Sequence, residues 1–344
     1  MSKFRKALFP FSIAYDAITR TKNFLYNSKV LNSVVFDIPV IVIGNLSTGG
    51  TGKTPHTEYI AKLTKKVDKT AVLSRGYGRK TTGFLLADSS STAAQLGDEP
   101  LQIANNIKDI DVAVCEDRAT GIKKLTQSRD SKIILLDDAF QHRKITGSLY
   151  ILLTTYSHPF YKDLILPAGN LRETSQNKNR ANIILITKCP SNLSNMEKEE
   201  ITKRISPQPH QNVFFTQIQY ATPKCILGSK KFSVLSKFLL VTGIVQSQPL
   251  VSHLLSLGKE VYEKKYPDHF NYQKSDINEM VKTLNHIDRE AAIVTTSKDA
   301  VKLLPLLQGM NISVPVFEIP IQISFLFEDE NKFNKLIITH VKRN

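Results

Sequence analysis

The stretch VIGNLSTGGTGKTPHTEYIA, residues 42–61, decides the fold of this chain. An apolar, β-branched run leads into a glycine-rich turn, and a helical pattern follows at Lys53 and Thr54. Strand, turn and helix in this order are typical of a P-loop, in which backbone N–H groups cradle phosphates, the lysine reaches the outer phosphates and the hydroxyl binds Mg²⁺. The predicted nucleotide-binding residues are Ser47, Thr48, Gly49, Gly50, Thr51, Gly52, Lys53 and Thr54.

The loop departs from the pattern G-x-x-x-x-G-K-[ST] at its first position, which is occupied by Ser47, and the nearest upstream glycine is Gly44. Pro55 is compatible with the first turn of a helix, where no N–H is needed. A glycine-rich turn without a ligand is the alternative interpretation. The buried strand before the loop and the helix after it favour the phosphate site.

A P-loop needs a second acid for Mg²⁺ near the end of a neighbouring strand. The segment IILLDDAFQH, residues 133–142, provides Asp137 and Asp138 directly after four apolar residues. The predicted metal ligands are therefore Thr54, Asp137 and Asp138, although an ordinary turn at a strand end would look similar. The pattern indicates ATP or GTP with Mg²⁺, and the absence of a guanine-reading N-K-x-D-like signature favours ATP.

Apolar runs alternate with helical patterns along the chain, which predicts an α/β fold with a P-loop NTPase-like, mostly parallel sheet and helices on both faces. We expect the kinase-like core at residues 31–215 and a smaller C-terminal α/β domain at 216–344, with a boundary near 205–225. The expected strands of the core are 39–44, 70–74, 110–115, 132–138, 149–154 and 182–187. The C-terminal region is expected to contain strands at 213–220, 238–244, 291–296 and 314–320, a helix at 248–257 and a helix capped by Ser275.

Residues 1–30 predict an amphipathic helix rich in aromatic and basic side chains. Its apolar positions recur at helical spacing and are Phe11, Ala14, Tyr15, Ile18 and Leu25, with Phe24 beside them. The surrounding basic residues are Lys3, Arg5, Lys6, Arg20, Lys22 and Lys29. Such a helix can lie in a membrane interface or pack on its own protein.

The chain has 344 residues and a formal net charge of +15, which suits an anionic partner without choosing among nucleic acid, membrane and phosphorylated substrate. No apolar run is long enough to predict a transmembrane helix. The three cysteines are widely spaced and predict neither a metal site nor a disulfide framework.

Six segments in fixed order resemble the tetraacyldisaccharide 4′-kinase family, the lipid A 4′-kinases. They are IGNLSTGGTGKTP (43–55), LSRGYGRK (73–80), GDEP (97–100), DDAFQH (137–142), LPAGNLRE (166–173) and TTSKDAVKL (295–303). The basic, aromatic amino-terminal helix is also similar. The chain departs from the family's usual residues at Ala139, Phe270 and Ser297, none of which removes an obviously needed charge.

The resemblance implies transfer of the γ-phosphate of ATP, with Mg²⁺, to the 4′-hydroxyl of a tetraacyl disaccharide 1-phosphate in lipid A biosynthesis. It also implies peripheral attachment to the cytoplasmic face of the bacterial inner membrane. The expected partners are then the lipid substrate and an anionic membrane surface, which the amino-terminal helix would contact. We expect neither nucleic acid nor an obligate protein partner.

We expect GDEP (97–100) on a loop between the second and third strands. Within the resemblance, Asp98 of this loop is the expected base for the sugar hydroxyl, and His269 in YPDHFNY (266–272) is expected to pair with it across two domains. Lys53, Arg118 and Arg172 are the expected cations for the charge that develops on the phosphoryl group, with Arg75 as a further candidate. Each of these residues could instead be structural. The same holds for His142. In TTSKDAVKL, Ser297 could cap a helix, so we assign little weight to Lys298 and Asp299.

Two rivals remain open from the sequence. The chain could be a P-loop kinase or ATPase with a soluble acceptor, or a nucleotide-switched protein that binds nucleic acid. The second is disfavoured because no strand interleaves aromatic and basic residues.

Overall fold

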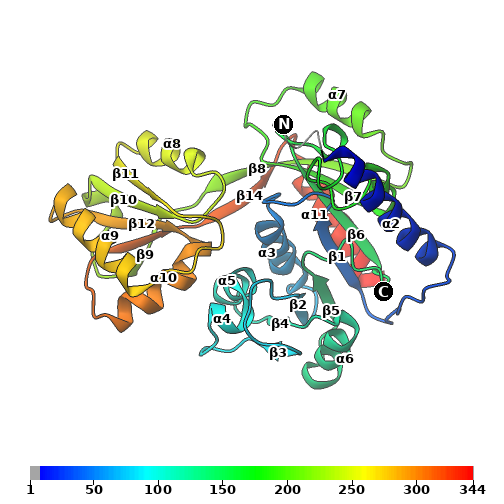
Figure 1. Cartoon of the computed structure of the whole chain (residues 1–344), viewed down its shortest axis with the longest axis horizontal. Helices are drawn as coiled ribbons and strands as arrows, with labels where there is room; N and C mark the ends of the chain where they lie inside the picture. Colours follow the sequence, from blue (N-terminus) through cyan, green and yellow to red (C-terminus); the bar gives the residue numbers. More distant parts are fainter. Residues whose placement is uncertain (1–7, 344) are drawn as a thin grey trace.

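The computed structural model describes residues 8–343, in which two sheets lie side by side. Strands β8 (Asn212–Tyr220) and β14 (Ile321–Phe325) extend between the larger body and the smaller one (Figure 1). They pair antiparallel, with Tyr220 opposite Ile321. The two bodies are therefore joined by a pair of strands rather than by a loose linker.

The larger sheet contains nine strands in the order β14-β8-β7-β6-β1-β5-β2-β4-β3. Its strands before β8 are β1 (Val40–Asn45), β2 (Thr70–Ser74), β3 (Leu85–Leu86), β4 (Asp111–Val114), β5 (Ile133–Leu136), β6 (Leu149–Thr155) and β7 (Ile183–Thr187). All neighbours pair in parallel except the two edge strands, β3 and β14. The central strands are buried Val, Ile and Leu runs, as a sheet covered on both faces requires.

Helices cover both faces of this sheet, which confirms the predicted fold class. On one face, α3 (Lys53–Thr64), α5 (Asp98–Asn106) and α11 (Glu330–Arg343) contribute to a common apolar core. On the opposite face lie α6 (Arg118–Arg129) and α7 (Asn195–Ile205). The short helix α4 (Ala93–Leu96) precedes α5.

The smaller sheet has five strands in the order β11-β10-β12-β13-β9. These are β9 (Lys224–Leu227), β10 (Lys237–Thr242), β11 (Glu260–Lys265), β12 (Ala292–Thr296) and β13 (Val316–Ile319), and only β9 runs antiparallel to its neighbour. Its helices are α8 (Gln248–Ser256), α9 (Lys274–Ile287) and α10 (Ser297–Gly309).

The sheets divide the chain differently from the expected ranges. We expected 216–344 to form one C-terminal domain, but β8 and β14 both belong to the larger sheet, and α11 packs beside α3. The smaller sheet is thus an insertion spanning 224–319. The cause is a pairing between segments far apart in sequence, which local patterns do not reveal.

The amino-terminal helix α2 (Phe9–Asn27) is present as expected, whereas Lys3, Arg5 and Lys6 lie outside the described residues. Its large apolar side chains point away from the protein: Phe11, Ile18 and Phe24 are 66%, 69% and 67% exposed. The side facing the core is polar and includes the buried residues Ser12 and Asn23. The helix therefore does not pack its apolar face on its own protein. No helix among the described residues is both long and apolar enough to span a bilayer.

Three local predictions need correction. The helix expected to be capped by Ser275 is capped two residues earlier, by Gln273, and begins at Lys274; Gln273 and Asp276 form its capping box. Thr296 rather than Ser297 caps α10. The GDEP segment was expected in a loop, but Asp98 is the first residue of α5.

Candidate functional site

The predicted phosphate loop connects the end of β1 to the start of α3, at the carboxyl edge of the larger sheet. Gly49 and Gly52 have φ angles of +108° and +83°, a region that favours glycine. The Asn45 amide donates to the Thr51 hydroxyl at 2.9 Å, and the Thr187 hydroxyl donates to the Thr51 carbonyl at 2.8 Å. Side chains from two strands thus hold the loop in shape without a ligand.

The segment LPAGNLRE lies directly beside this loop. The N–H of Thr48 donates to the Asn170 carbonyl at 2.7 Å, and the N–H of Arg172 donates to the Leu46 carbonyl at 2.6 Å. These contacts place the guanidinium of Arg172 next to the loop, as expected for a phosphate-binding cation.

Asp138 lies between the two cations at this edge. Its Oδ1 is 3.7 Å from Nζ of Lys53 and 3.2 Å from Nη1 of Arg172. The structure therefore brings Lys53, Asp138 and Arg172 together from three separate motifs. Two cations beside a P-loop can neutralise phosphate oxygens.

Asp137 is fully buried at the end of β5 and accepts a hydrogen bond from the Thr57 hydroxyl at 2.9 Å. Its Oδ2 has no hydrogen-bond partner among residues 8–343. Burial, followed by the charges of Glu99 and Asp138, raises the pKa of Asp137 to about 7. A buried carboxylate oxygen without a partner is suited to a cation.

These oxygen donors fit Mg²⁺. The described residues contain no cluster of three or more His, Cys, Asp or Glu side chains with metal-ligand geometry. Mg²⁺ is commonly held by one or two carboxylates together with substrate phosphates, so a sparse set matches that ion. Asp137 and Thr54 would supply the protein oxygens.

The expected pair of Asp98 and His269 is formed. Nδ1 of His269 lies 3.3 Å from Oδ2 of Asp98. Asp98 is the first residue of α5 in the larger body, whereas His269 lies between β11 and α9 in the smaller one. Lys302 of α10 donates to the same oxygen at 2.8 Å. Burial opposes ionisation of Asp98, but hydrogen bonds from His269 and Lys302 outweigh it and hold its pKa below the ordinary value.

The other expected arginines differ in setting. Arg118 is buried; its Nη1 donates to the Cys115 carbonyl at 2.7 Å, and its Nε has no hydrogen-bond partner in the described part of the chain. Desolvation lowers the pKa of Arg118 to about 10, a cost that the nearby charges of Asp137 and Asp138 partly offset. Arg75 is exposed and forms no ion pair within residues 8–343. Arg118 is thus close enough to Asp137 and Asp138 for their charges to affect its pKa, whereas Arg75 forms no ion pair with either acid.

His142 lines a cavity of about 350 Å³ between α2 and the strand-end segments. The cavity is lined by Lys22, Tyr26, Glu116, Asp117, Gln141, His142, Arg143 and Lys144. Nε2 of His142 is buried without a hydrogen-bond partner in the region that the structure describes, and burial lowers the pKa of this imidazole to about 4. His142 thus contributes a neutral imidazole, which can both donate and accept a hydrogen bond, to the lining of this polar cavity.

The residues given little weight have structural partners. Asp299 is buried and accepts hydrogen bonds from the Gly243 N–H and the Tyr272 hydroxyl, both at 3.0 Å. Lys298 pairs with Asp268 at 2.7 Å and lies 3.3 Å from Nε2 of His269. Lys298 therefore orders the imidazole from the side opposite Asp98.

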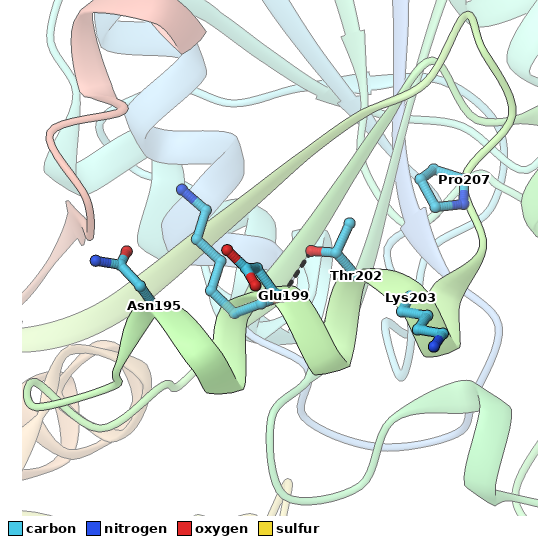
Figure 2. A pocket seen from close by; sticks show the side chains of 6 residues that line it. Asn195, Glu199, Thr202, Lys203 and Pro207 are labelled. Carbon is cyan, nitrogen blue, oxygen red and sulfur yellow. Dashed lines mark hydrogen bonds between the residues drawn. The ribbon is translucent and has the colours of Figure 1, made fainter.

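A larger hollow of about 550 Å³ lies along the outer surface of α7 (Figure 2). Its lining consists of Asn195, Lys198, Glu199, Thr202, Lys203 and Pro207. None of these residues belongs to the motifs or clusters above, so volume alone does not mark the site.

Lys188 was missed by the sequence analysis. It follows β7 directly, and its Nζ lies 3.9 Å from where a Cβ on Gly50 would be. It makes no hydrogen bond or ion pair among the described residues, and desolvation lowers its pKa. Its position at the carboxyl end of a parallel strand was the available signal.

Comparison with known proteins agrees with this geometry. A family model described as tetraacyldisaccharide-1-P 4′-kinase matches residues 4–342. A tetraacyldisaccharide 4′-kinase of Flavobacterium johnsoniae is 40% identical over 350 residues, covering 100% of this chain and 99% of the relative. One of Cytophaga hutchinsonii is 40% identical over 330 residues, covering 95% and 93%.

A solved structure is similar over the whole chain. It is the crystal structure of an "apo" form of LpxK from Aquifex aeolicus in complex with ATP, with a TM-score of 0.75 and 27% sequence identity. The match covers 98% of this chain and 99% of that one.

Proposed function

This chain belongs to the tetraacyldisaccharide 4′-kinase family and is therefore a kinase that phosphorylates the 4′-hydroxyl of a lipid disaccharide 1-phosphate; we propose how its residues divide that reaction. The P-loop would hold the triphosphate of ATP, and Asp98 would act as the base. The observation that carries this assignment is the pairing of Asp98 with His269. The pair lies close to the phosphate loop, because the charge of Glu99, next to Asp98 in the chain, contributes to the raised pKa of Asp137.

The phosphoryl transfer divides among groups already described. Backbone N–H groups of the loop and the ammonium of Lys53 bind the outer phosphates, and Arg172 neutralises the equatorial oxygens of the transferred group. The 4′-oxygen forms a bond to the γ-phosphorus while the bond to the bridging oxygen of ADP breaks. Asp98 accepts the proton of the hydroxyl, and His269 orients its carboxylate.

Mg²⁺ would be held by Thr54 and by the unpartnered Oδ2 of Asp137, with Asp138 nearby. When bound, the ion neutralises charge on the outer phosphates. Asp138 already pairs with Lys53 and Arg172, so we assign it the role of positioning these cations.

The disaccharide headgroup would occupy the cavity beside His142, which α2 closes with Lys22 and Tyr26. The cations of its lining, Lys22, Arg143 and Lys144, would pair with an anionic headgroup, and the acids Glu116 and Asp117 would accept hydrogen bonds from sugar hydroxyls. Because α2 lines it and also presents an apolar outer face, the acyl chains of the substrate could remain in the membrane while its sugar is phosphorylated.

We place the enzyme peripherally at the cytoplasmic face of the bacterial inner membrane, where ATP is available. Support comes from the exposed phenylalanines and isoleucines of α2 and from the net charge of +15, which favours an anionic lipid surface. The helix is attached to the core by polar contacts, including Tyr15 to the Arg172 carbonyl at 3.2 Å. The membrane surface would thus lie next to the phosphate site.

The decisive experiment incubates the protein with ATP labelled at the γ-phosphate and a tetraacyl disaccharide 1-phosphate in detergent, followed by analysis of the product. We expect label at the 4′-position, and loss of turnover in Asp98→Asn. Transfer of label only to a soluble sugar would instead support a kinase with a soluble acceptor. Full turnover in Asp98→Asn would remove this residue as the base.

A further inference from the structure

Asp98 is held from one side by two donors of the smaller domain. Its Oδ2 accepts from Nζ of Lys302 at 2.8 Å and from Nδ1 of His269 at 3.3 Å. Lys302 is on α10, and its side chain is only 7% exposed. The shorter of the two contacts therefore comes from a lysine of the segment TTSKDAVKL (295–303) to which the sequence alone assigned no role.

The other carboxylate oxygen, Oδ1, accepts no hydrogen bond from residues 8–343, and it is not one of their buried atoms without a partner. It therefore reaches solvent while Oδ2 is fixed. A carboxylate with one oxygen clamped and the other open is arranged to receive a proton along one direction.

Lys302 is suited to clamp this group. A nearly buried ammonium requires a counter-charge, and Asp98 is the carboxylate with which it forms an ion pair. The neighbouring Lys298 cannot substitute, since it pairs with Asp268 and contacts the far nitrogen of His269. The remaining groups near the clamp are Glu99, next to Asp98 in the chain, and Tyr272, whose ring centre is 5.8 Å from Nζ of Lys302.

We propose that Lys302 is a positioning residue for the phosphoryl transfer: its ammonium fixes Oδ2 of Asp98 so that Oδ1 faces the acceptor hydroxyl. This inference rests on the proposed role of Asp98 as base. Phosphoryl transfer has a loose transition state, in which orienting the nucleophile matters more than strong basicity. A clamp that keeps the carboxylate ionised and oriented therefore suits the reaction, even though it lowers basicity.

The clamp also joins the two bodies of the molecule, because α10 of the inserted domain contacts α5 of the core. Lys302 would then be, with His269, one of the two residues of the inserted domain that hold the carboxylate of Asp98 in position. Two simpler roles predict different kinetics: a purely structural ion pair between domains, or a direct contact with the nucleotide.

The test is a double-mutant cycle. Lys302→Met, Lys302→Gln and Lys302→Arg are made in the wild-type chain and in Asp98→Asn, and kcat and both KM values are measured with ATP and the lipid acceptor. Lys264→Met is the matched control, because Lys264 is another lysine of the inserted domain in an ion pair, 2.6 Å from Glu279. Thermal unfolding shows which variants are folded, and Lys302→Gln replaces Lys302→Met if the latter is not.

We expect Lys302→Met to lower kcat about 10- to 100-fold, with the KM for ATP changed less than about twofold. Lys302→Arg should recover most of kcat, and Lys264→Met should resemble wild type. In Asp98→Asn, the same substitution at Lys302 should cost less than about twofold, since there is no carboxylate left to position.

An equal loss in both backgrounds would overturn the inference, because it would show that Lys302 acts independently of Asp98, with Asp98 still the base. A lowered Tm at unchanged kcat would also overturn it and leave a structural ion pair. A raised KM for ATP at unchanged kcat would also overturn it, in favour of a nucleotide contact. Full turnover in Asp98→Asn would remove the proposed base and this inference together.

Discussion

Lys53 and Asp138 form an ion pair at the mouth of the phosphate loop, with Nζ 3.7 Å from Oδ1. The lysine is already aimed at the edge of the sheet where the strand-end acids lie. Because Arg172 shares the same carboxylate, the two cations are held together before any phosphate arrives. The acid therefore sets the spacing of the groups that neutralise the substrate.

We expect Lys53→Ala to lower kcat/KM at least about 100-fold, because one cation facing the developing charge is lost. The measurement is steady-state transfer of labelled phosphate to the lipid acceptor. Lys62→Ala is the control, since Lys62 is an exposed lysine in the last turn of the same helix. Normal turnover in Lys53→Ala would exclude the assigned role.

Asp137 makes the ligand-free protein sensitive to pH. Its pKa is about 7 in the folded state, against an ordinary value of 3.8 for an aspartate, so the folded protein binds the proton more tightly than the unfolded chain. The free energy of unfolding should therefore fall as the pH rises from about 4 to about 7 and should change little above that range. Asp137→Asn has no carboxyl group to ionise at this position, so its free energy of unfolding should not fall for this reason as the pH rises.

We therefore expect Asp137→Asn to have a Tm a few degrees above wild type at pH 8 in the absence of Mg²⁺ and ATP. The amide oxygen can still accept from Thr57, so the buried contact is kept. Differential scanning calorimetry at pH 5 and pH 8 checks this, and the difference should shrink at pH 5. A lower Tm for the variant at both values would contradict the burial argument.

The apolar face of α2 should control membrane binding. We expect the double variant Phe11→Ser, Ile18→Ser to sediment with anionic vesicles at least about tenfold less than wild type, because two exposed apolar side chains are lost from the interface. Met196→Ser is the control, as Met196 is 78% exposed on α7. Equal loss in both proteins, or none in the double variant, would show that α2 is not the contact.

Lys188 should contribute to nucleotide affinity. Its ammonium lies over the phosphate loop without a counter-charge, so a bound triphosphate would supply one. We expect Lys188→Met to weaken binding of a non-hydrolysable ATP analogue about tenfold in isothermal titration calorimetry without lipid. Lys203→Met, on the outer helix α7, should bind the analogue as wild type does.

Gly44 is required by packing rather than by the phosphate. A Cβ there would lie 2.7 Å from Cβ of Phe140 and 2.8 Å from its backbone nitrogen. Gly44→Ala should therefore destabilise the protein by about 1–3 kcal/mol, measured by urea unfolding. Gly309→Ala is the control, because no atom would lie within 4 Å of the added methyl group.

The features with local signals could be predicted from the sequence. The strand at 70–74 and the helix beginning at Lys53 are where the patterns placed them, because β-branched runs and glycine turns act over a few residues. The same holds for the acids after β5, since parallel strands align their carboxyl ends.

The remaining features of the fold and of the site depend on contacts between segments that are distant in the sequence. The return of β14 to the larger sheet is set by its pairing with β8, and nothing within 321–325 identifies that partner. Likewise, nothing in the sequence gives Lys188 a role, and the segment TTSKDAVKL does not by itself distinguish Lys302 from its neighbours; only the fold brings the two lysines to the loop and to Asp98. The pairing of Asp98 with His269 was expected through family resemblance, because spacing along the chain does not relate them.

The pairing of Tyr220 with Ile321 means that the inserted domain leaves and re-enters the core at one place. Its two ends are neighbours across a ladder, so a short turn could close the core after excision, and the excised piece could be cloned as a separate module. Mixing the two modules would then show whether phosphate transfer can be reconstituted from halves that no longer share a backbone.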